Sequence, residues 1–343
     1  SSNVDLSAVD FSDVDASSGS LTVTLTTSTG GDLTAAAGTG ITLGGTPAAL
    51  TISGTLTDLN NYFDTVSNIT YLHGTPGTNG NDADTIQVEI SDNGNTGSGG
   101  GGDIDLGTVN VDIGDMNDAP VVGAPGSALA AIEQVNLNIH GSGFTVSDAD
   151  EGGAGATATL NVGEGTITVA AGDSGVTITG GNGTGTVTLS GTIAQLDNLL
   201  TGGGTGTIVY LNSSDTPSAS TTFTVTVNDG GNTGTDPGLT GDGSSEEGTN
   251  NVTINITATN DDPTNAGSLP SDISVTEDVS SNVDLSAVDF SDVDAAASSL
   301  TVTLTTSTGG NLTAAAGTGI TLGGTPSALT ISGNLTDLNN YFN

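Results

Sequence analysis

The chain has 343 residues, 39 Asp and Glu side chains and no Lys or Arg, so its formal charge near neutral pH is -39. This balance excludes nucleic acids and anionic membrane surfaces as expected partners, because both are bound chiefly through Lys and Arg. With 33% hydrophobic and only 11% charged residues, the chain is too apolar for a disordered acidic tail, and we expect it to fold.

The chain contains an internal repeat. Residues 1–16 recur letter for letter at 280–295, and residues 1–64 match residues 280–343 at 57 of 64 positions. Such similarity indicates recent duplication within a tandem array. A diverged unit with the same order of landmarks lies between the two copies, so three successive domains are expected.

We place the domain boundaries at the prolines of the two linkers, Pro120 and Pro263. The predicted domains are domain A (1–119, without its first strand), domain B (120–262) and domain A′ (263–343, the N-terminal part of a second copy of A). We interpret both ends as arbitrary cuts in a longer array. The alternative is strand donation, in which residues near Ile273 to Glu277 complete domain A of a neighbouring chain.

The predicted strands alternate apolar and polar residues with period two, which is typical of half-buried β-strands. In chain order their apolar residues are Leu21, Val23, Leu25; Ile86, Val88, Ile90; Val109, Val111, Ile113; Phe223, Val225, Val227; and Val252, Ile254, Ile256. Two short stretches instead have helical spacing, at Leu56, Leu59, Phe63 and at Ile193, Leu196, Leu200. We therefore predict an all-β chain of antiparallel β-sandwich domains, each with one short helix.

Acidic landmarks recur in the same order in each unit. A glutamate comes first (Glu133 and Glu277), and an Asp-x-Asp pair follows a Phe-containing strand. A strand then runs into VEISDNG or VTVNDGG, and the unit ends in the linker DMNDAP or ATNDDP. An Asp-x-Asp pair alone is often a turn former, because Asp accepts hydrogen bonds from nearby backbone amides.

In these landmarks the sequence resembles the cadherin-like repeats of giant bacterial surface adhesins. The resemblance extends over nearly the whole chain. It implies immunoglobulin-like or cadherin-like sandwiches in an elongated array, with Ca²⁺ bound between consecutive domains. The physical chemistry agrees, since Ca²⁺ takes six to eight oxygen ligands and the chain has no Cys for a thiolate zinc site.

The candidate calcium ligands are carboxylates and amides at the domain junctions. Those expected between A and B are Asp115, Asn117, Asp118, Asp148 and Asp150. Those expected between B and A′ are Glu133, Asn260, Asp261, Asp262, Asp292 and Asp294, while Asp13, Asp15 and Glu277 are the matching residues of further junctions. Asp92 and Asp229 are interpreted as hairpin-loop residues instead.

The function expected from these features is that of an extracellular, cell-surface stalk, filament or adhesin made rigid by calcium. Its expected partners are calcium ions, neighbouring repeats of the same chain and other copies in a fibre, without membrane insertion of this segment. One alternative is a ligand-binding adhesion module that uses the loop at 236–250. Another is a glycoside hydrolase with paired carboxylates. We expect no enzyme, because the acids recur at every junction and the chain has no Trp to line a sugar cleft.

Overall fold

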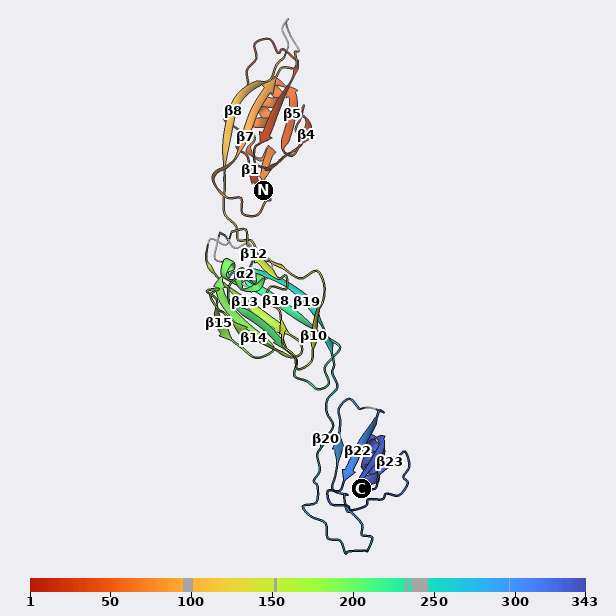
Figure 1. Ribbon diagram of the computed structural model, residues 1–343. Helices are drawn as coiled ribbons and strands as arrows, with labels where there is room; N and C mark the ends of the chain where they lie inside the picture. Colours follow the sequence, from red (N-terminus) through yellow and green to blue (C-terminus); the bar gives the residue numbers. More distant parts are fainter. Residues whose placement is uncertain (95–100, 151–152, 232–233, 236–245, 296) are drawn as a thin grey trace.

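The computed structural model describes residues 1–94, 101–150, 153–231, 234–235, 246–295 and 297–343. Three bodies follow one another along an extended path, with domain B between domains A and A′ (Figure 1). Within the described residues, no ladder between named strands joins one of the three ranges to another. The described part of the chain is mostly β with three short α-helices, which confirms the predicted all-β fold class.

Domain A contains two sheets. The larger has the order β4-β5-β2-β7-β8 and the smaller the order β1-β6-β3. Its strands are β1 (Ser2–Asn3), β2 (Ser20–Thr27), β3 (Asp32–Ala35), β4 (Thr42–Thr46), β5 (Ala49–Thr55), β6 (Ile69–Leu72), β7 (Gly80–Ser91) and β8 (Ile104–Ile113). Its helices are α1 (Leu56–Phe63) and the 3-10 turn η1 (Val66–Asn68). The core between the sheets includes Val23, Leu25 and Phe63.

Domain B repeats this plan with more complete sheets, ordered β10-β19-β18-β13-β16-β15, β11-β17-β14 and β12-β9. The strands are β9 (Val121–Gly123), β10 (Leu129–Ile132), β11 (Leu137–Asn138), β12 (Thr145–Ser147), β13 (Gly155–Val162), β14 (Thr166–Ala170), β15 (Thr177–Gly180), β16 (Thr186–Thr192), β17 (Thr207–Leu211), β18 (Ser220–Asn228) and β19 (Glu247–Thr257). Helix α2 (Ile193–Thr201) covers part of the core.

Domain A′ has only part of this architecture. Its sheets are ordered β22-β24-β23 and β20-β21. The strands are β20 (Thr264–Asn265), β21 (Phe290–Ser291), β22 (Ser299–Thr305), β23 (Thr321–Thr325) and β24 (Ala328–Asn334), followed by helix α3 (Leu335–Phe342).

The helices form where the sequence predicts them, directly after a strand. The Thr55 hydroxyl accepts a hydrogen bond from the backbone N–H of Asp58, which caps α1. Thr192 and Gln195 form a reciprocal capping box at α2, and Gly202 ends that helix in the left-handed region at φ 91°. The two N-caps, Thr55 and Thr192, mark where each helix begins after the preceding strand.

Two features differ from the sequence prediction. The ladder between β10 and β19 is parallel, within an otherwise antiparallel sheet. The strand expected at Val109, Val111 and Ile113 is β8, but its apolar residues are not buried as a face; Val109 is 37% exposed. The reason is that β8 lies at the edge of its sheet, and domain A has no counterpart of β10 to cover it in the described structure.

A buried carboxylate joins the two sheets of domain A. Asp84 on β7 is 1% exposed and accepts hydrogen bonds from the Ser28 hydroxyl (2.7 Å), the Tyr71 hydroxyl on β6 (2.8 Å) and the backbone amides of Ser28 and Thr29 (2.9 Å each). Burial acts to raise its pKa, but these hydrogen bonds prevail and hold the pKa well below its usual range. Asp84 is therefore a structural residue of the domain interior.

Candidate metal centre at the domain junctions

The three Asp-x-Asp pairs that follow Phe11, Phe144 and Phe290 adopt the same local turn. In each pair, one oxygen of the first aspartate accepts a hydrogen bond from the backbone N–H of the second: Asp148 from Asp150 (3.1 Å), Asp13 from Asp15 (3.1 Å) and Asp292 from Asp294 (3.2 Å). The first aspartate of each pair therefore forms a turn. It uses only one carboxylate oxygen of each pair and leaves the others for further contacts.

At the junction between A and B, the linker aspartate contacts both domains. The backbone N–H of Asp118 donates to Oδ2 of Asp150 in domain B (3.0 Å), and Oδ2 of Asp118 accepts from the backbone N–H of Gly77 in domain A (3.1 Å). The linker also pairs with Thr235 of domain B through two backbone hydrogen bonds, with Asp115 and Asn117. The linker is therefore held in a defined conformation against domain B.

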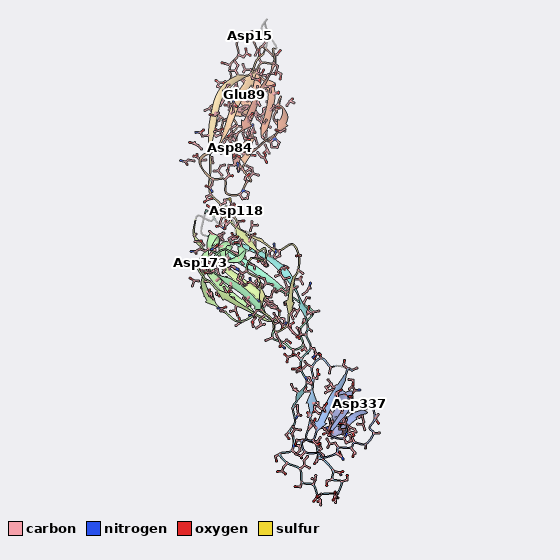
Figure 2. The ribbon with its side chains drawn as sticks, viewed as in Figure 1. Asp15, Asp84, Glu89, Asp118, Asp173 and Asp337 are labelled. Atoms are coloured by element: carbon pink, nitrogen blue, oxygen red, sulfur yellow. The ribbon has the colours of Figure 1, made fainter. Side chains whose placement is uncertain are left out.

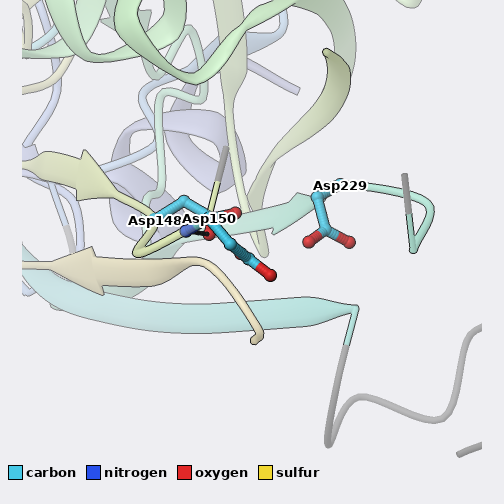
Figure 3. Close-up of side chains that lie close together, drawn as sticks. All are labelled: Asp148, Asp150 and Asp229. Atoms are coloured by element: carbon cyan, nitrogen blue, oxygen red, sulfur yellow. Dashed lines mark hydrogen bonds between the residues drawn. The ribbon is translucent and has the colours of Figure 1, made fainter. Parts of the chain in front are cut away.

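A third carboxylate, Asp229 at the end of β18, joins the Asp148–Asp150 pair (Figure 3). One carboxylate oxygen from each of the three residues lies within 4.8 Å of those of the other two. Asn117 donates from Nδ2 to Oδ2 of Asp229 (3.0 Å), which connects the linker to the same cluster. Burial, the adjacent Asp150 carboxyl and the charges of Asp150 and Asp229 raise the pKa of Asp148 to about 7.

The junction between B and A′ repeats the linker contact. The backbone N–H of Asp261 donates to Oδ2 of Asp294 (2.9 Å), as that of Asp118 does to Asp150. Glu133, 1% exposed at the end of β10, accepts from the backbone N–H (2.6 Å) and hydroxyl (2.9 Å) of Thr259 in the linker. Burial, together with the charges of nearby acids, raises the pKa of Asp261.

Both junctions contain buried carboxylate oxygens that have no hydrogen-bond partner in the described structure. Within the part of the chain that the structure describes, seven buried side-chain atoms have no hydrogen-bond partner. Four of them are carboxylate oxygens at the junctions: Asp148 Oδ2, Asp150 Oδ1, Glu133 Oε2 and Asp261 Oδ2. Buried carboxylate oxygens without a donor are costly, and a chain without Lys or Arg offers them no ion-pair partner. An all-oxygen donor set of this kind fits a hard divalent cation.

The structure brings some of the predicted ligands together and leaves others apart. Asn117, Asp118, Asp148 and Asp150 meet at one junction, and Glu133, Asp261 and Asp294 meet near the other. The Asp115 side chain instead accepts a hydrogen bond from Asn79 of domain A. Asp292 shapes its own turn, and Asn260 and Asp262 are exposed.

Glu277 and the first Asp-x-Asp pair lie away from both junctions. Glu277 is exposed on A′, in a turn completed by Asp278 at φ 59°, the conformation that Gln134 (φ 60°) adopts after Glu133. Asp15 lies at the end of domain A remote from B, whereas Asp118 lies between A and B (Figure 2).

Two acidic residues at the junctions were not among the ligands predicted from the sequence. Asp229 was interpreted as a hairpin residue, and its Oδ1 does accept a hydrogen bond from the backbone N–H of Gly231 (3.0 Å), yet the same residue completes the Asp148–Asp150 cluster. Asp215 reaches the second junction through Gln134, which donates to both Asp215 (3.0 Å) and Asp261 (3.1 Å). Only the register of β18 against β13 and β19 places Asp229 there, and no local motif encodes that register.

No family model and no curated protein matches the sequence. Among solved structures, the chain is similar to the C-terminal domain of the AgI/II polypeptide BspA of Streptococcus agalactiae, at 10% identity over 71% of this chain and 87% of that one, with a TM-score of 0.27. It is also similar to mouse cadherin-23 EC22-24 (15%, 92% and 76%, TM-score 0.30) and to protocadherin gammaB7 EC3-6 (12%, 89% and 60%, TM-score 0.30).

The three helices of the described residues are all too short to cross a membrane. The loop at 236–250, considered as a ligand-binding insertion, is described only from Glu246 onward; residues 236–245 lie outside the described residues.

Proposed function

We propose that the chain is a segment of an extracellular surface stalk or adhesin whose domain junctions are clamped by Ca²⁺. The main support for this proposal is a contact found at both junctions, in which the backbone N–H of a linker aspartate donates to the second aspartate of the Asp-x-Asp pair. Beside this contact lie buried carboxylate oxygens that have no hydrogen-bond partner in the described structure. A cation there neutralises the clustered charges and joins groups from two domains. The relative orientation of the domains then becomes fixed.

The residues that would hold the ion at the first junction are Asp148, Asp150 and Asp229, with Asn117 and Asp118 from the linker. At the second junction they are Glu133, Asp261 and Asp294. Extracellular modules use such sites at dissociation constants of about 10⁻⁴ to 10⁻³ M, because calcium is plentiful outside cells. Mg²⁺ is a poor substitute, since it requires a tighter octahedral arrangement and keeps its water.

The proposal is tested by titrating the full chain with Ca²⁺ by calorimetry and by small-angle scattering with Ca²⁺ or EDTA. Calcium should give a saturable binding isotherm and lengthen the particle, and EDTA should increase bending between the domains. Identical scattering profiles in both conditions would contradict the clamp.

Matched variants assign the effect to each junction. Asp150→Asn should remove binding between A and B only, and Asp294→Asn should remove it between B and A′ only. Asp15→Asn is the control, because it alters the same type of turn at the end of A that faces no junction in this chain. Equal losses from all three variants would show that the turns, and not the junctions, are responsible.

The enzymatic alternative gains no support from the geometry. The Asp148–Asp150 turn and its linker contact are repeated at Asp292 and Asp294, whereas a catalytic pair is expected once in a substrate cleft. Hydrolysis of a polysaccharide by the full chain, abolished by Asp150→Asn, would favour the enzyme over the clamp.

A further inference from the structure

A tight turn follows strand β6 of domain A, and the sequence dictates its shape. Residues 75–78 are Thr-Pro-Gly-Thr, and the backbone N–H of Thr78 donates to the carbonyl oxygen of Thr75 (3.3 Å). Gly77 lies in the left-handed region at φ 69°. Proline at the second position and a left-handed glycine at the third are typical of a type II β-turn. We call residues 75–78 the TPGT turn.

The TPGT turn contacts both the linker and domain B. The backbone N–H of Gly77 donates to Oδ2 of the linker residue Asp118 (3.1 Å). Gly77 also lies against Ala149, the middle residue of the Asp148–Asp150 turn. A β-carbon added at Gly77 would lie 2.8 Å from the carbonyl oxygen of Ala149 and 3.3 Å from its β-carbon. The contact therefore depends on the absence of a side chain at position 77.

The TPGT turn is anchored on domain A by His73. Nδ1 of His73 accepts a hydrogen bond from the backbone N–H of Thr75 (3.4 Å), and Nε2 lies 3.2 Å from the carbonyl oxygen of Thr29. A neutral imidazole with its proton on Nε2 satisfies both contacts. Domain A thus holds the turn in place through its own residues, whether or not domain B is docked.

Domain B has a related loop that does not reach its own linker. After strand β17, residues 216–218 are Thr-Pro-Ser, where residues 75–77 are Thr-Pro-Gly. The backbone N–H of Ser218 donates to the carboxylate of Glu164 within domain B, at 3.2 and 3.3 Å from its two oxygens. In the second linker, Oδ2 of Asp261 has no partner in the described structure. The backbone donor that reaches the linker at the first junction is therefore directed into domain B at the second.

The domains also differ in the middle residue of the Asp-x-Asp turn. This residue is Ala149 in domain B, but Val14 in A and Val293 in A′. Valine leaves the turn itself intact, because the linker amide still reaches Asp294 (2.9 Å) as it reaches Asp150 (3.0 Å). A valine side chain, however, fills two of the three staggered positions on its β-carbon. An Asp-Val-Asp turn therefore adds methyl groups where the TPGT turn lies against Ala149.

We propose that the TPGT turn is a docking surface for the next domain of the array. It accepts the Asp-Ala-Asp turn of a B-type domain and excludes the Asp-Val-Asp turn of an A-type domain. The contact is made by backbone groups and one linker carboxylate, so it needs no metal ion and is independent of the calcium clamp. Two A-type domains cannot be joined through it, and the order A, B, A′ obeys this rule.

The test is amide hydrogen exchange by NMR and small-angle scattering on the full chain in EDTA. Ala149→Val should accelerate exchange at Gly77 about tenfold, because its hydrogen bond to a charged acceptor is lost. Bending between A and B should increase as well. Ala149 is exposed, so the substitution does not disturb the core of B. Unchanged exchange at Gly77 would overturn the proposal, and so would an unprotected Gly77 in the unsubstituted chain.

Two variants and one further amide serve as controls. Ala149→Ser keeps a small side chain, and Val293→Ala changes the other junction only, so neither should alter exchange at Gly77. In Ala149→Val, the N–H of Asp118 should keep its exchange rate, because it donates to Asp150 and not to domain A. Faster exchange at Asp118 would show that valine distorts the Asp148–Asp150 turn, and it would overturn the steric selection.

Gly77→Ser tests the other side of the contact, because it gives domain A the Thr-Pro-Ser sequence of the loop in B. It should increase bending as Ala149→Val does, and the double variant should bend no more than either single variant. Gly74→Ser is the matched control, since a β-carbon at Gly74 would meet no atom within 4 Å. Additive effects in the double variant would show that Gly77 and Ala149 act separately, which contradicts docking.

Discussion

Domains A and A′ show how nearly identical sequences behave in different surroundings. Residues 1–64 and 280–343 differ at only seven positions, and both copies form the same hairpin and helix. Thr42 pairs with Ser53 in A as Thr321 pairs with Ser332 in A′. Among the described residues of A′ strand β3 does not recur, because its partner β6 comes from residues 69–72 and this sequence extends only to the position that matches residue 64. The hairpin is therefore encoded locally, whereas β3 depends on a distant strand.

The burial of equivalent side chains also differs between the two copies. Leu25 on β2 is fully buried between the sheets of A, whereas its counterpart Leu304 on β22 is partly exposed. The two residues have the same sequence neighbours from 20 to 31 and from 299 to 310. Leu25 and Leu304 therefore contribute differently to the stability of their domains only because different strands pack around them. Paired substitutions measure that difference.

The largest expected effect is that of truncating the buried leucine. Leu25→Ala should destabilise domain A by about 3 to 4 kcal/mol, whereas Leu304→Ala should cost less than about 1 kcal/mol, because a partly exposed side chain leaves no enclosed cavity. The measurement is amide hydrogen exchange by NMR at Val23 and Val302. Peptide mass spectrometry is unsuitable, since peptides from the two stretches are identical. Equal losses would mean that A′ packs as fully as A.

Asp84→Asn should destabilise domain A by about 2 to 3 kcal/mol, because it removes a charged acceptor that holds several donors in the interior. Exchange at Val302 should not change, since the described residues of A′ form no equivalent of β7. Asp82→Asn is the control, because Asp82 is exposed two residues away. An unchanged melting temperature for Asp84→Asn would show that these donors find other acceptors.

Acid should destabilise domain A more than domain A′. The pKa of Asp84 is lowered on folding, so its contribution is fully present above its unfolded pKa of about 3.9 and is lost as the pH falls through the folded value. Exchange at Val23 should therefore accelerate more than exchange at Val302 between about pH 4 and pH 2. The Asp84→Asn variant should lose this extra acid dependence; if it keeps it, another carboxylate is responsible.

The smallest effect concerns the helix caps, which differ naturally between the copies. Thr55 caps α1, and Asn334 caps α3 through the same hydrogen bond to the amide three residues on. Asn is an equal or slightly better N-cap than Thr, so Thr55→Asn and Asn334→Thr should shift stability by only a few tenths of a kcal/mol. The control Thr55→Ala should cost about 1 kcal/mol. A large effect of Thr55→Asn would show that the cap makes tertiary contacts as well.

The sequence was sufficient to predict the features that depend on short-range pattern. The alternation at Leu21, Val23 and Leu25 predicted a strand with one buried face, and the spacing of Leu56, Leu59 and Phe63 predicted α1. Features that need the register of distant strands were beyond it. The parallel β10–β19 pairing is one of these, and the position of Asp229 beside Asp148 is another.

Asp84 illustrates the same limit inside the fold. Its sequence, NDADT, contains two aspartates of similar appearance, and only the tertiary structure buries one and exposes the other. Asp82 lies where the register of β7 against β8 shifts, and its backbone is left-handed (φ 55°), whereas Asp84 faces Tyr71 and Ser28. A one-residue change of register would turn Asp84 to the opposite face of the sheet.

The near identity of residues 1–64 and 280–343 has a consequence for synthesis in the cell. Because the two copies are nearly identical, both can compete for the strands that residues 65–119 form in domain A. Misassembly between similar neighbours is a characteristic failure of tandem arrays during folding. Domain B, which shares the plan of A but has diverged in sequence, separates the two copies and lets the first finish folding before the second emerges from the ribosome.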